Sequence, residues 1–170
     1  MWFFTADEHY YHSKIIEYCN RPFRGVEHMN SSLIERFNVL VSKNDVTVHA
    51  GDFSWGNKSD TQKIIKQLNG SHIFLRGCHD HWLPKSAKFV FQEHFEELEN
   101  KLLVVCHYCM RTWKKSHYNS YHAFGHSHGR LKAIGKSHDI GVDNNTYFPV
   151  SIYTLGAIFD QQPDNFNKVK

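Results

Sequence analysis

The sequence has little of what marks secreted, membrane-spanning or strongly nucleic-acid-binding proteins. Its 170 residues include only four cysteines, too few for a disulfide framework in a chain of this length, so we expect a reduced, cytoplasmic protein. No apolar run approaches the roughly 20 residues that span a bilayer, so no membrane partner is expected. The net charge of +3 is too small to indicate a nucleic-acid groove by itself. The apolar start, Met1 to Thr5, has no basic segment and leads into Asp7, so it predicts a strand rather than a signal peptide.

The remaining composition is that of one globular domain. Hydrophobic residues make up 41% of the chain and charged residues 22%, and the chain is long enough to bury a sizeable core. No internal repeat or low-complexity linker divides the sequence. We therefore expect a single domain over residues 1–160, followed by a polar, frayed C-terminal tail over residues 161–170.

Apolar runs alternate with amphipathic segments along most of the chain. Strands are predicted at residues 2–5, 45–49, 72–75 and 102–106, with shorter strand-like pieces at 89–91, 140–142 and 150–159. Helices are predicted at residues 13–19, 33–41 and 59–69. This alternation indicates an α/β fold.

Polar clusters follow the apolar runs, and the most conspicuous of them is Gly125–Gly129. It holds two histidines one residue apart, bracketed by glycines that let the backbone turn tightly. The upstream clusters are Asp7 with His9, Gly51 with Asp52, Gly77 to Asp80, and His107. The carboxyl ends of strands in an α/β sheet gather in one crevice, where ligands bind, so we expect these clusters to meet.

The side chains in these clusters are of metal-ligand type. The candidate ligands are Asp7, His9, Asp52, His107, His126 and His128. Such a mixed set of nitrogen and oxygen donors suits manganese, iron, zinc or nickel. It has too many members for one tetrahedral zinc, whereas two ions with a bridging carboxylate would accommodate it.

The order of these clusters resembles the signature of the calcineurin-like metallophosphoesterase superfamily. That signature runs D-x-H, GD, GNH(D/E), H, GHxH, and the corresponding positions are Asp7/His9, Gly51/Asp52, Gly77/Cys78/His79/Asp80, His107 and Gly125/His126/His128. The short chain further resembles small bacterial and phage-type members that lack a cap domain. The resemblance implies a four-layer αββα sandwich, with two mixed β-sheets between helices.

The resemblance also implies a function, a binuclear metal-dependent phosphohydrolase acting as a phosphodiesterase on nucleotide-type or other phosphodiesters. The first metal would be held by Asp7, His9, Asp52 and His128, and the second by Asp52, Cys78, His107 and His126. A hydroxide between the ions would attack phosphorus in line. His79 would assist the leaving group, and Asp80 would fix the tautomer of His79. The implied partner is a phosphate-ester substrate, nucleotide or nucleic-acid derived; the oligomeric state stays open.

Position 78 departs from the family pattern, because Cys78 stands where the family has an asparagine that supplies a neutral oxygen ligand. A thiolate is softer, bonds zinc at roughly 2.3 Å and adds a negative charge. Three interpretations stay open: Cys78 is a ligand that favours zinc, a non-ligand beside a weak second site, or a position changed from its natural residue. We therefore expect two divalent ions, manganese first, with zinc, iron or nickel as alternatives and zinc favoured if Cys78 is a ligand.

Substrate contacts are assigned to arginines on two loops near the predicted site. Arg21 and Arg24 lie in the loop over residues 20–25, and Arg111 lies in the loop over residues 110–122; solvated surface arginines are the alternative. Two other functions stay open. One is a catalytically weakened protein-binding scaffold with this fold, and the other is a non-enzymatic nucleic-acid module.

Overall fold

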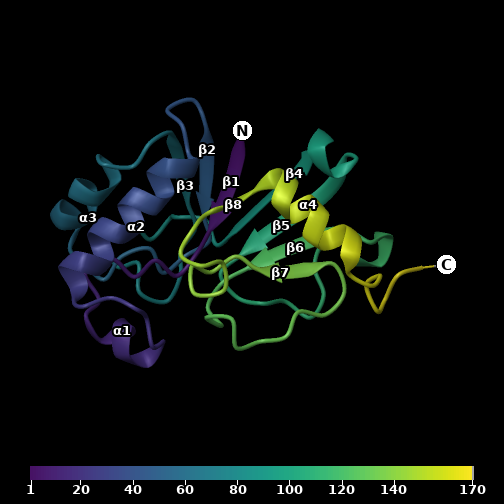
Figure 1. The fold of residues 1–170 in the computed structure, drawn as a ribbon. Coiled ribbons are helices and arrows are strands. Elements are labelled where there is room, and N and C mark those ends of the chain that lie inside the picture. The colour runs from purple at the N-terminus through teal and green to yellow at the C-terminus, as the bar shows by residue number, and fades with distance from the viewer. Residues whose placement is uncertain (170) are drawn as a thin grey trace.

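The chain folds into two four-stranded mixed sheets flanked by helices, in a computed structural model that describes residues 1–169 (Figure 1). This confirms the predicted α/β sandwich. The elements are β1 (Trp2–Thr5), α1 (Lys14–Tyr18), α2 (Val26–Leu40), β2 (Val46–His49), α3 (Lys58–Ile65), β3 (Ser71–Phe74), β4 (Val90–Phe95), η1 (Glu96–Leu98), β5 (Lys101–Cys106), η2 (Ser116–Tyr118), β6 (Tyr121–Phe124), β7 (Ser137–Asp139), β8 (Val150–Ser151) and α4 (Ile152–Gln161).

The sheet topology brings the ends of parallel strands together. The first sheet has the order β3-β2-β1-β8, with β1, β2 and β3 parallel and β8 antiparallel. The second has the order β4-β5-β6-β7, with β5, β6 and β7 parallel and β4 antiparallel. A parallel bridge between Ala6 and Gly141 joins the segment after β1 to the segment after β7, and Val142 N donates to Ala6 O at 3.0 Å. The loop that follows β1 in the first sheet and the loop that follows β7 in the second sheet are therefore neighbours.

Side-chain alternation along β1 connects the two halves of the core. Phe4 packs in the cluster between the sheets, with Leu103 and Val105 of β5 and with buried side chains of α4. Phe3 points the other way, into the cluster with Met29 and Leu33 of α2. Successive strand residues face opposite sides, so a single strand serves both interfaces. Burial of both faces explains why Trp2, Phe3 and Phe4 of β1 are all apolar.

Three predicted elements differ from the structure. The strand-like piece expected at 140–142 is not a strand, because β7 ends at Asp139 and only an isolated bridge from Gly141 to Ala6 follows it. The helix expected from residue 33 begins about two turns earlier, at Val26, because Gly25 rather than a serine capping box precedes its first turn. The apolar stretch expected as a strand at 150–159 is mostly the helix α4, whose Ser151 side chain accepts from Thr154 N at 3.1 Å. An N-cap serine and buried residues at helical spacing outweigh strand propensity there.

The polar tail is packed rather than frayed over the part that the structure describes. Asn165 is 4% exposed, and its side-chain nitrogen donates to the backbone oxygens of Ser116 and Ser120. Its side-chain oxygen accepts from Lys136 N at 2.8 Å. A polar segment can thus be held by hydrogen bonds that composition does not reveal.

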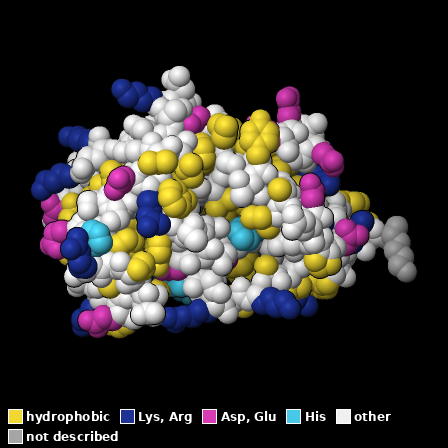
Figure 2. Space-filling view, viewed as in Figure 1, with side chains coloured by type: hydrophobic (Ala, Val, Ile, Leu, Met, Phe, Trp, Pro, Cys, Tyr) yellow, Lys and Arg dark blue, Asp and Glu magenta, His cyan; other side chains and the backbone are white. Residues whose placement is uncertain are grey.

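The surface carries charges of both signs. Figure 2 shows basic and acidic side chains interspersed on one face of the molecule, among hydrophobic patches. None of the helices within residues 1–169 combines the length and the apolar character that crossing a bilayer requires.

Candidate metal centre

The predicted ligands meet at the strand ends through left-handed backbone conformations. Asp7, His9, Asp52, His126 and His128 all have positive φ, between 49° and 68°. The segment that carries Asp7 and His9 is therefore not an extended continuation of β1. Positive φ is uncommon for residues with a side chain, and such conformations concentrate at functional sites.

Close backbone approach at this point requires glycine. A Cβ on Gly77 would lie 2.3 Å from Asp52 N and 2.3 Å from Asp52 Oδ1. A Cβ on Gly125 would lie 2.8 Å from Asp7 Oδ2, which accepts a hydrogen bond from His126 N at 2.7 Å. The glycines of the sequence clusters therefore leave room for the carboxylates.

The first group of candidate ligands consists of Asp7, His9 and His128, whose donor atoms lie within 4.8 Å of one another. Asp7 is fully buried and His9 is 3% exposed. The His9 and His128 rings stack with centroids 5.3 Å apart.

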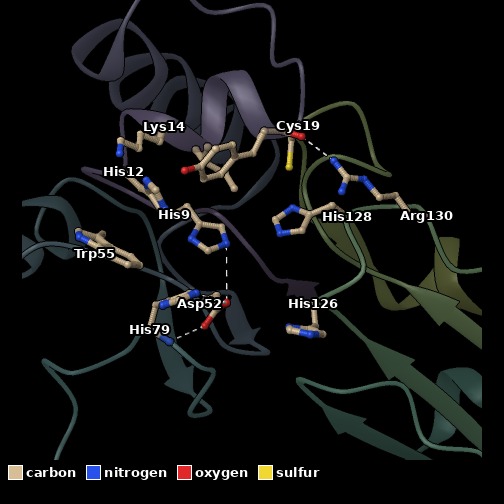
Figure 3. A pocket seen from close by; sticks show the side chains of 12 residues that line it. His9, His12, Lys14, Cys19, Asp52, Trp55, His79, His126, His128 and Arg130 are labelled. Atoms are coloured by element: carbon tan, nitrogen blue, oxygen red, sulfur yellow. Dashed lines mark hydrogen bonds and ion pairs between the residues drawn. The ribbon is translucent and has the colours of Figure 1, made fainter.

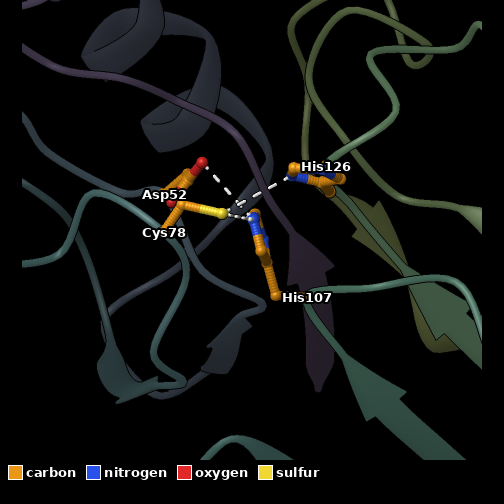
Figure 4. A group of neighbouring side chains, drawn as sticks. All are labelled: Asp52, Cys78, His107 and His126. Atoms are coloured by element: carbon orange, nitrogen blue, oxygen red, sulfur yellow. Dashed lines mark hydrogen bonds and ion pairs between the residues drawn. The ribbon is translucent and has the colours of Figure 1, made fainter.

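The second group consists of Asp52, Cys78, His107 and His126, again within 4.8 Å of one another (Figure 4). Cys78 Sγ lies 3.7 Å from His107 Nε2 and 3.8 Å from His126 Nδ1. Asp52 Oδ2 lies 3.4 Å from His107 Nε2. One sulfur, two nitrogens and one oxygen thus converge.

Asp52 lies between the two groups. Its Oδ2 atom is 3.7 Å from His9 Nε2 of the first group, as well as 3.4 Å from His107 Nε2 of the second. Its Oδ1 atom accepts from His79 N at 2.8 Å, which fixes the carboxylate. Asp52 is therefore close to both groups, which is the place that the family resemblance assigns to a shared ligand.

Buried atoms without partners test whether these residues fit a metal. Asp7 Oδ1 and both ring nitrogens of His9 are buried and have no hydrogen-bond partner among residues 1–169. Burying polar atoms unpaired is costly, and a cation is a partner that would satisfy the carboxylate and an imidazole together. The donor set also suits first-row divalent metals. The residues therefore fit the predicted ions.

Oxygen atoms close to Nδ1 of two candidate histidine ligands determine which ring nitrogen is free to bind a metal. His107 Nδ1 lies 3.0 Å from Ala50 O, and His128 Nδ1 lies 2.6 Å from Asp143 Oδ2. Such partners fix the tautomer and leave Nε2 as the donor atom for a metal. The sequence interpretation missed Asp143, although it follows an apolar strand-like piece like the other clusters.

The titration of these groups reflects burial and neighbouring charges. Burial raises the pKa of Asp7 to about 7. For His107, burial favours the neutral ring, but the hydrogen bond and charge of Asp52 outweigh it and raise the pKa to about 9. For His128, burial is likewise outweighed by the hydrogen bond to Asp143, and the pKa rises to about 10. Metal binding must displace these protons, so metal affinity rises with pH.

Arg21, expected in an accessible loop as a substrate contact, has instead a place in the interior. Its side chain is buried, and it forms a bidentate pair with Asp143 at 2.8 Å on both oxygens. It also donates to the backbone oxygens of Asp7 and Glu8. Arg21 therefore positions Asp143, and through it His128, while holding the backbone beside Asp7.

Asp80 has a structural role that differs from the predicted one. It is fully buried, and its oxygens accept from the backbone nitrogens of Asp52, Phe53 and Gly77 at 2.7 to 2.9 Å. Trp82 Nε1 donates to it at 3.0 Å. No hydrogen bond in the described chain joins Asp80 to the His79 ring, so Asp80 holds the loop rather than the tautomer of His79.

His79 faces an open pocket of about 670 Å³ (Figure 3). Its side chain is 38% exposed, and its Nε2 atom lies 3.9 Å from Asp52 Oδ2. The Trp55 ring lies 4.6 Å from the His79 ring, centroid to centroid. His79 is thus beside the candidate metal ligands and accessible from the pocket.

Different cations line this pocket from those predicted. Arg24 does not line it, and Arg111 stacks over Phe166 at 4.2 Å beside a separate cavity. Lys14 and Arg130 line it instead. The sequence offered no signal for these two, since single cations on loops and short helices are common.

One comparison with known proteins supports the fold, and none of them names an activity. No protein-family model matches the chain. An uncharacterized protein from Methanocaldococcus jannaschii is 39% identical over 80 residues, which is 46% of this chain and 46% of that protein. The match therefore spans about half the length of this curated relative. The crystal structure of a protein of unknown function from Aquifex aeolicus is similar with a TM-score of 0.70 and 21% identity, over 93% of this chain and 98% of that one. At that identity the likeness concerns the fold alone.

Proposed function

We propose that this chain is a binuclear metal-dependent phosphodiesterase of the calcineurin-like metallophosphoesterase type. The observation that carries the proposal is the position of Asp52 between two groups of candidate ligands at the ends of parallel strands. A shared carboxylate between two such groups is the arrangement of two-metal hydrolases. The order of the sequence clusters supports the same assignment.

The residues that would hold the ions follow from the two groups. Asp7, His9 and His128 would hold one, Cys78, His107 and His126 the other, and Asp52 would be shared. When bound, two such ions lower the pKa of water and stabilise charge on a phosphoryl group. Asp143 and the backbone oxygen of Ala50 keep the imidazoles oriented for this task.

His79 is the group that would serve the leaving-group oxygen. It is a partly exposed histidine beside Asp52 in the pocket, and its backbone is anchored by the hydrogen bond from His79 N to Asp52 Oδ1. An imidazole in this position can donate a proton as the leaving alkoxide forms. The open pocket of about 670 Å³ is of the size that small-molecule sites have.

The proposal predicts that His79→Ala lowers the hydrolysis of bis-p-nitrophenyl phosphate by about 10²- to 10⁴-fold, the usual contribution of a general acid. Bound metal, measured by elemental analysis, is expected to stay the same because His79 belongs to neither ligand group. His81→Ala is the matched control, since His81 is an exposed histidine two residues away. Absence of turnover with manganese, nickel, zinc and cobalt alike would refute the proposal and favour a protein-binding scaffold.

We further propose that the Cys78 thiolate is a ligand and makes the second group prefer zinc. Its Sγ atom lies within 3.8 Å of a nitrogen of each histidine in that group. Sulfur, two imidazoles and a carboxylate form a tetrahedral zinc set, whereas an asparagine oxygen would suit harder ions.

Cys78→Asn is therefore expected to shift metal preference from zinc toward manganese. Competition between the two metals, followed by elemental analysis, measures the shift. Cobalt substitution adds a spectroscopic check, because the thiolate-to-cobalt charge-transfer absorption should vanish in Cys78→Asn and persist in the control Cys109→Asn. An unchanged spectrum and an unchanged preference would show that Cys78 is not a ligand.

A further inference from the structure

One end of the pocket that His79 faces is built from aromatic side chains. The Trp55 indole lies 4.4 Å from the His12 ring and 4.6 Å from the His79 ring, centroid to centroid. The His12 ring in turn lies 6.2 Å from the Tyr18 ring. Trp55 is 50% exposed and Tyr18 58% exposed, so this end presents ring surface to whatever enters.

Trp55 is held firmly although its ring is accessible. Its backbone nitrogen donates to Tyr10 O at 2.9 Å, and the preceding residue, Ser54, pairs with Tyr10 in a parallel bridge. This backbone belongs to the same loop as Asp52, and the indole packs against the His12 and His79 rings, which places it beside the candidate metal ligands. A preorganised aromatic surface costs little entropy when a planar group stacks on it.

A second cavity, of about 300 Å³, adjoins the first at the end that Trp55 lines. Trp55, His12 and Lys14 line both cavities, so the indole stands between two hollows. The larger cavity falls within the range of small-molecule sites. Together they extend the room available beside His79.

Cations stand at both ends of the pocket. Figure 3 shows Lys14 with Trp55 at one end and Arg130 at the other, with His9, His128 and Asp52 between them. Neither Lys14 nor Arg130 forms an ion pair with a carboxylate in the described part of the chain, and the guanidinium of Arg130 donates to Tyr18 O. Unpaired cations around a pocket attract a ligand of negative charge.

We propose that this chain hydrolyses nucleotide phosphodiesters of dinucleotide size, and that the base of the leaving nucleoside stacks on Trp55. The inference rests on the proposed function. The scissile phosphate lies at the candidate metal ligands, and the substituent that remains on phosphorus extends toward Arg130. Water adds to phosphorus and releases one proton to the solvent, the bond from phosphorus to the leaving oxygen breaks, and that oxygen takes a proton from His79, which regains one from the solvent. The products are a nucleoside alcohol and a phosphomonoester.

Stacking is the interaction that suits this end of the pocket. Every base has a planar π-face, and a base stacked on an aromatic side chain contributes about 5- to 150-fold in affinity when measured by alanine substitution. The site beside Trp55 adjoins His79, which is the side on which the leaving group departs. A base at this place is therefore held while the bond to phosphorus breaks.

The test compares kcat/KM for a dinucleoside monophosphate with kcat/KM for two analogues that each lack one base. In the wild-type protein, removal of the base on the leaving side is expected to lower kcat/KM by about 5- to 150-fold, and removal of the other base by much less. In Trp55→Ala this discrimination is expected to fall to about one, whereas Trp55→Phe keeps most of it. A ratio between substrates is insensitive to general damage by the substitution.

Two outcomes separate this inference from the proposed function. Suppose that bis-p-nitrophenyl phosphate is hydrolysed but that kcat/KM does not differ between the dinucleoside monophosphate and its two analogues, or differs equally in Trp55→Ala. That outcome would overturn the base subsite and leave the proposed phosphodiesterase activity supported. Absence of all hydrolysis would refute the proposed function, and binding would then decide the subsite. Saturable quenching of tryptophan fluorescence by the dinucleoside monophosphate in the wild type, lost in Trp55→Phe, supports it; equal quenching in both overturns it.

Discussion

Asp52→Asn is expected to remove most of the bound metal and to lower phosphodiester hydrolysis by at least about 10³-fold. The substitution keeps the shape of the side chain and removes the negative charge that lies between the two ligand groups. Two-metal sites stabilise transition-state charge by several kcal/mol, and each 1.36 kcal/mol is a factor of ten in rate. The loss therefore affects both ions together.

Elemental analysis and hydrolysis of bis-p-nitrophenyl phosphate measure this effect side by side. Asp60→Asn is the matched control, because Asp60 is a carboxylate on α3 that pairs with Lys63 and belongs to neither group. Circular dichroism without added metal checks that both variants fold. Full metal content and full activity in Asp52→Asn would contradict the shared-ligand assignment.

Asp80→Ala is expected to destabilise the fold by about 3–5 kcal/mol, the cost of removing one partner from a buried, charged hydrogen-bond set. Its carboxylate accepts from the backbone nitrogens of Asp52, Phe53, Ser54 and Gly77, and the alanine would leave these buried donors without an acceptor. For a chain of 170 residues, the melting temperature is expected to fall by roughly 6–20 °C.

Thermal unfolding of the metal-free protein measures this prediction. Asp80→Asn retains one acceptor oxygen and is expected to lie between the wild type and Asp80→Ala. A role of Asp80 confined to the tautomer of His79 would give the opposite pattern, with lost turnover and an unchanged melting temperature.

The sequence predicted the positions of the candidate ligands better than it predicted the residues that hydrogen-bond to them. All seven candidate ligand positions fall into the two groups, because each follows a strand and the carboxyl ends of parallel strands meet. The partners of those ligands were missed. Arg21 and Asp143 are 122 residues apart, and nothing in either local segment indicates their pairing.

Contacts between distant segments also explain why the side chains of Asp80 and of the arginines assigned to substrate lie elsewhere than expected. Asp80 adjoins His79 in the sequence, but its side chain points into the loop that carries Asp52. Arg111 lies in a loop expected at the rim, but its guanidinium packs on Phe166 of the polar tail. Side-chain direction depends on packing partners from other parts of the chain, which neighbouring residues do not specify.

By itself, the sequence determined the kinds of donor atom, their order along the chain and their placement after strands. These features are local, since apolar runs, glycines and ligand-type residues act over a few positions. The tertiary structure alone decided that Asp52 stands between two groups, that Arg21 is buried against Asp143, and that Trp55 faces His79. Each of these contacts joins segments that only the packing of two sheets and their loops brings together, because long-range pairing has no periodic trace in a single sequence.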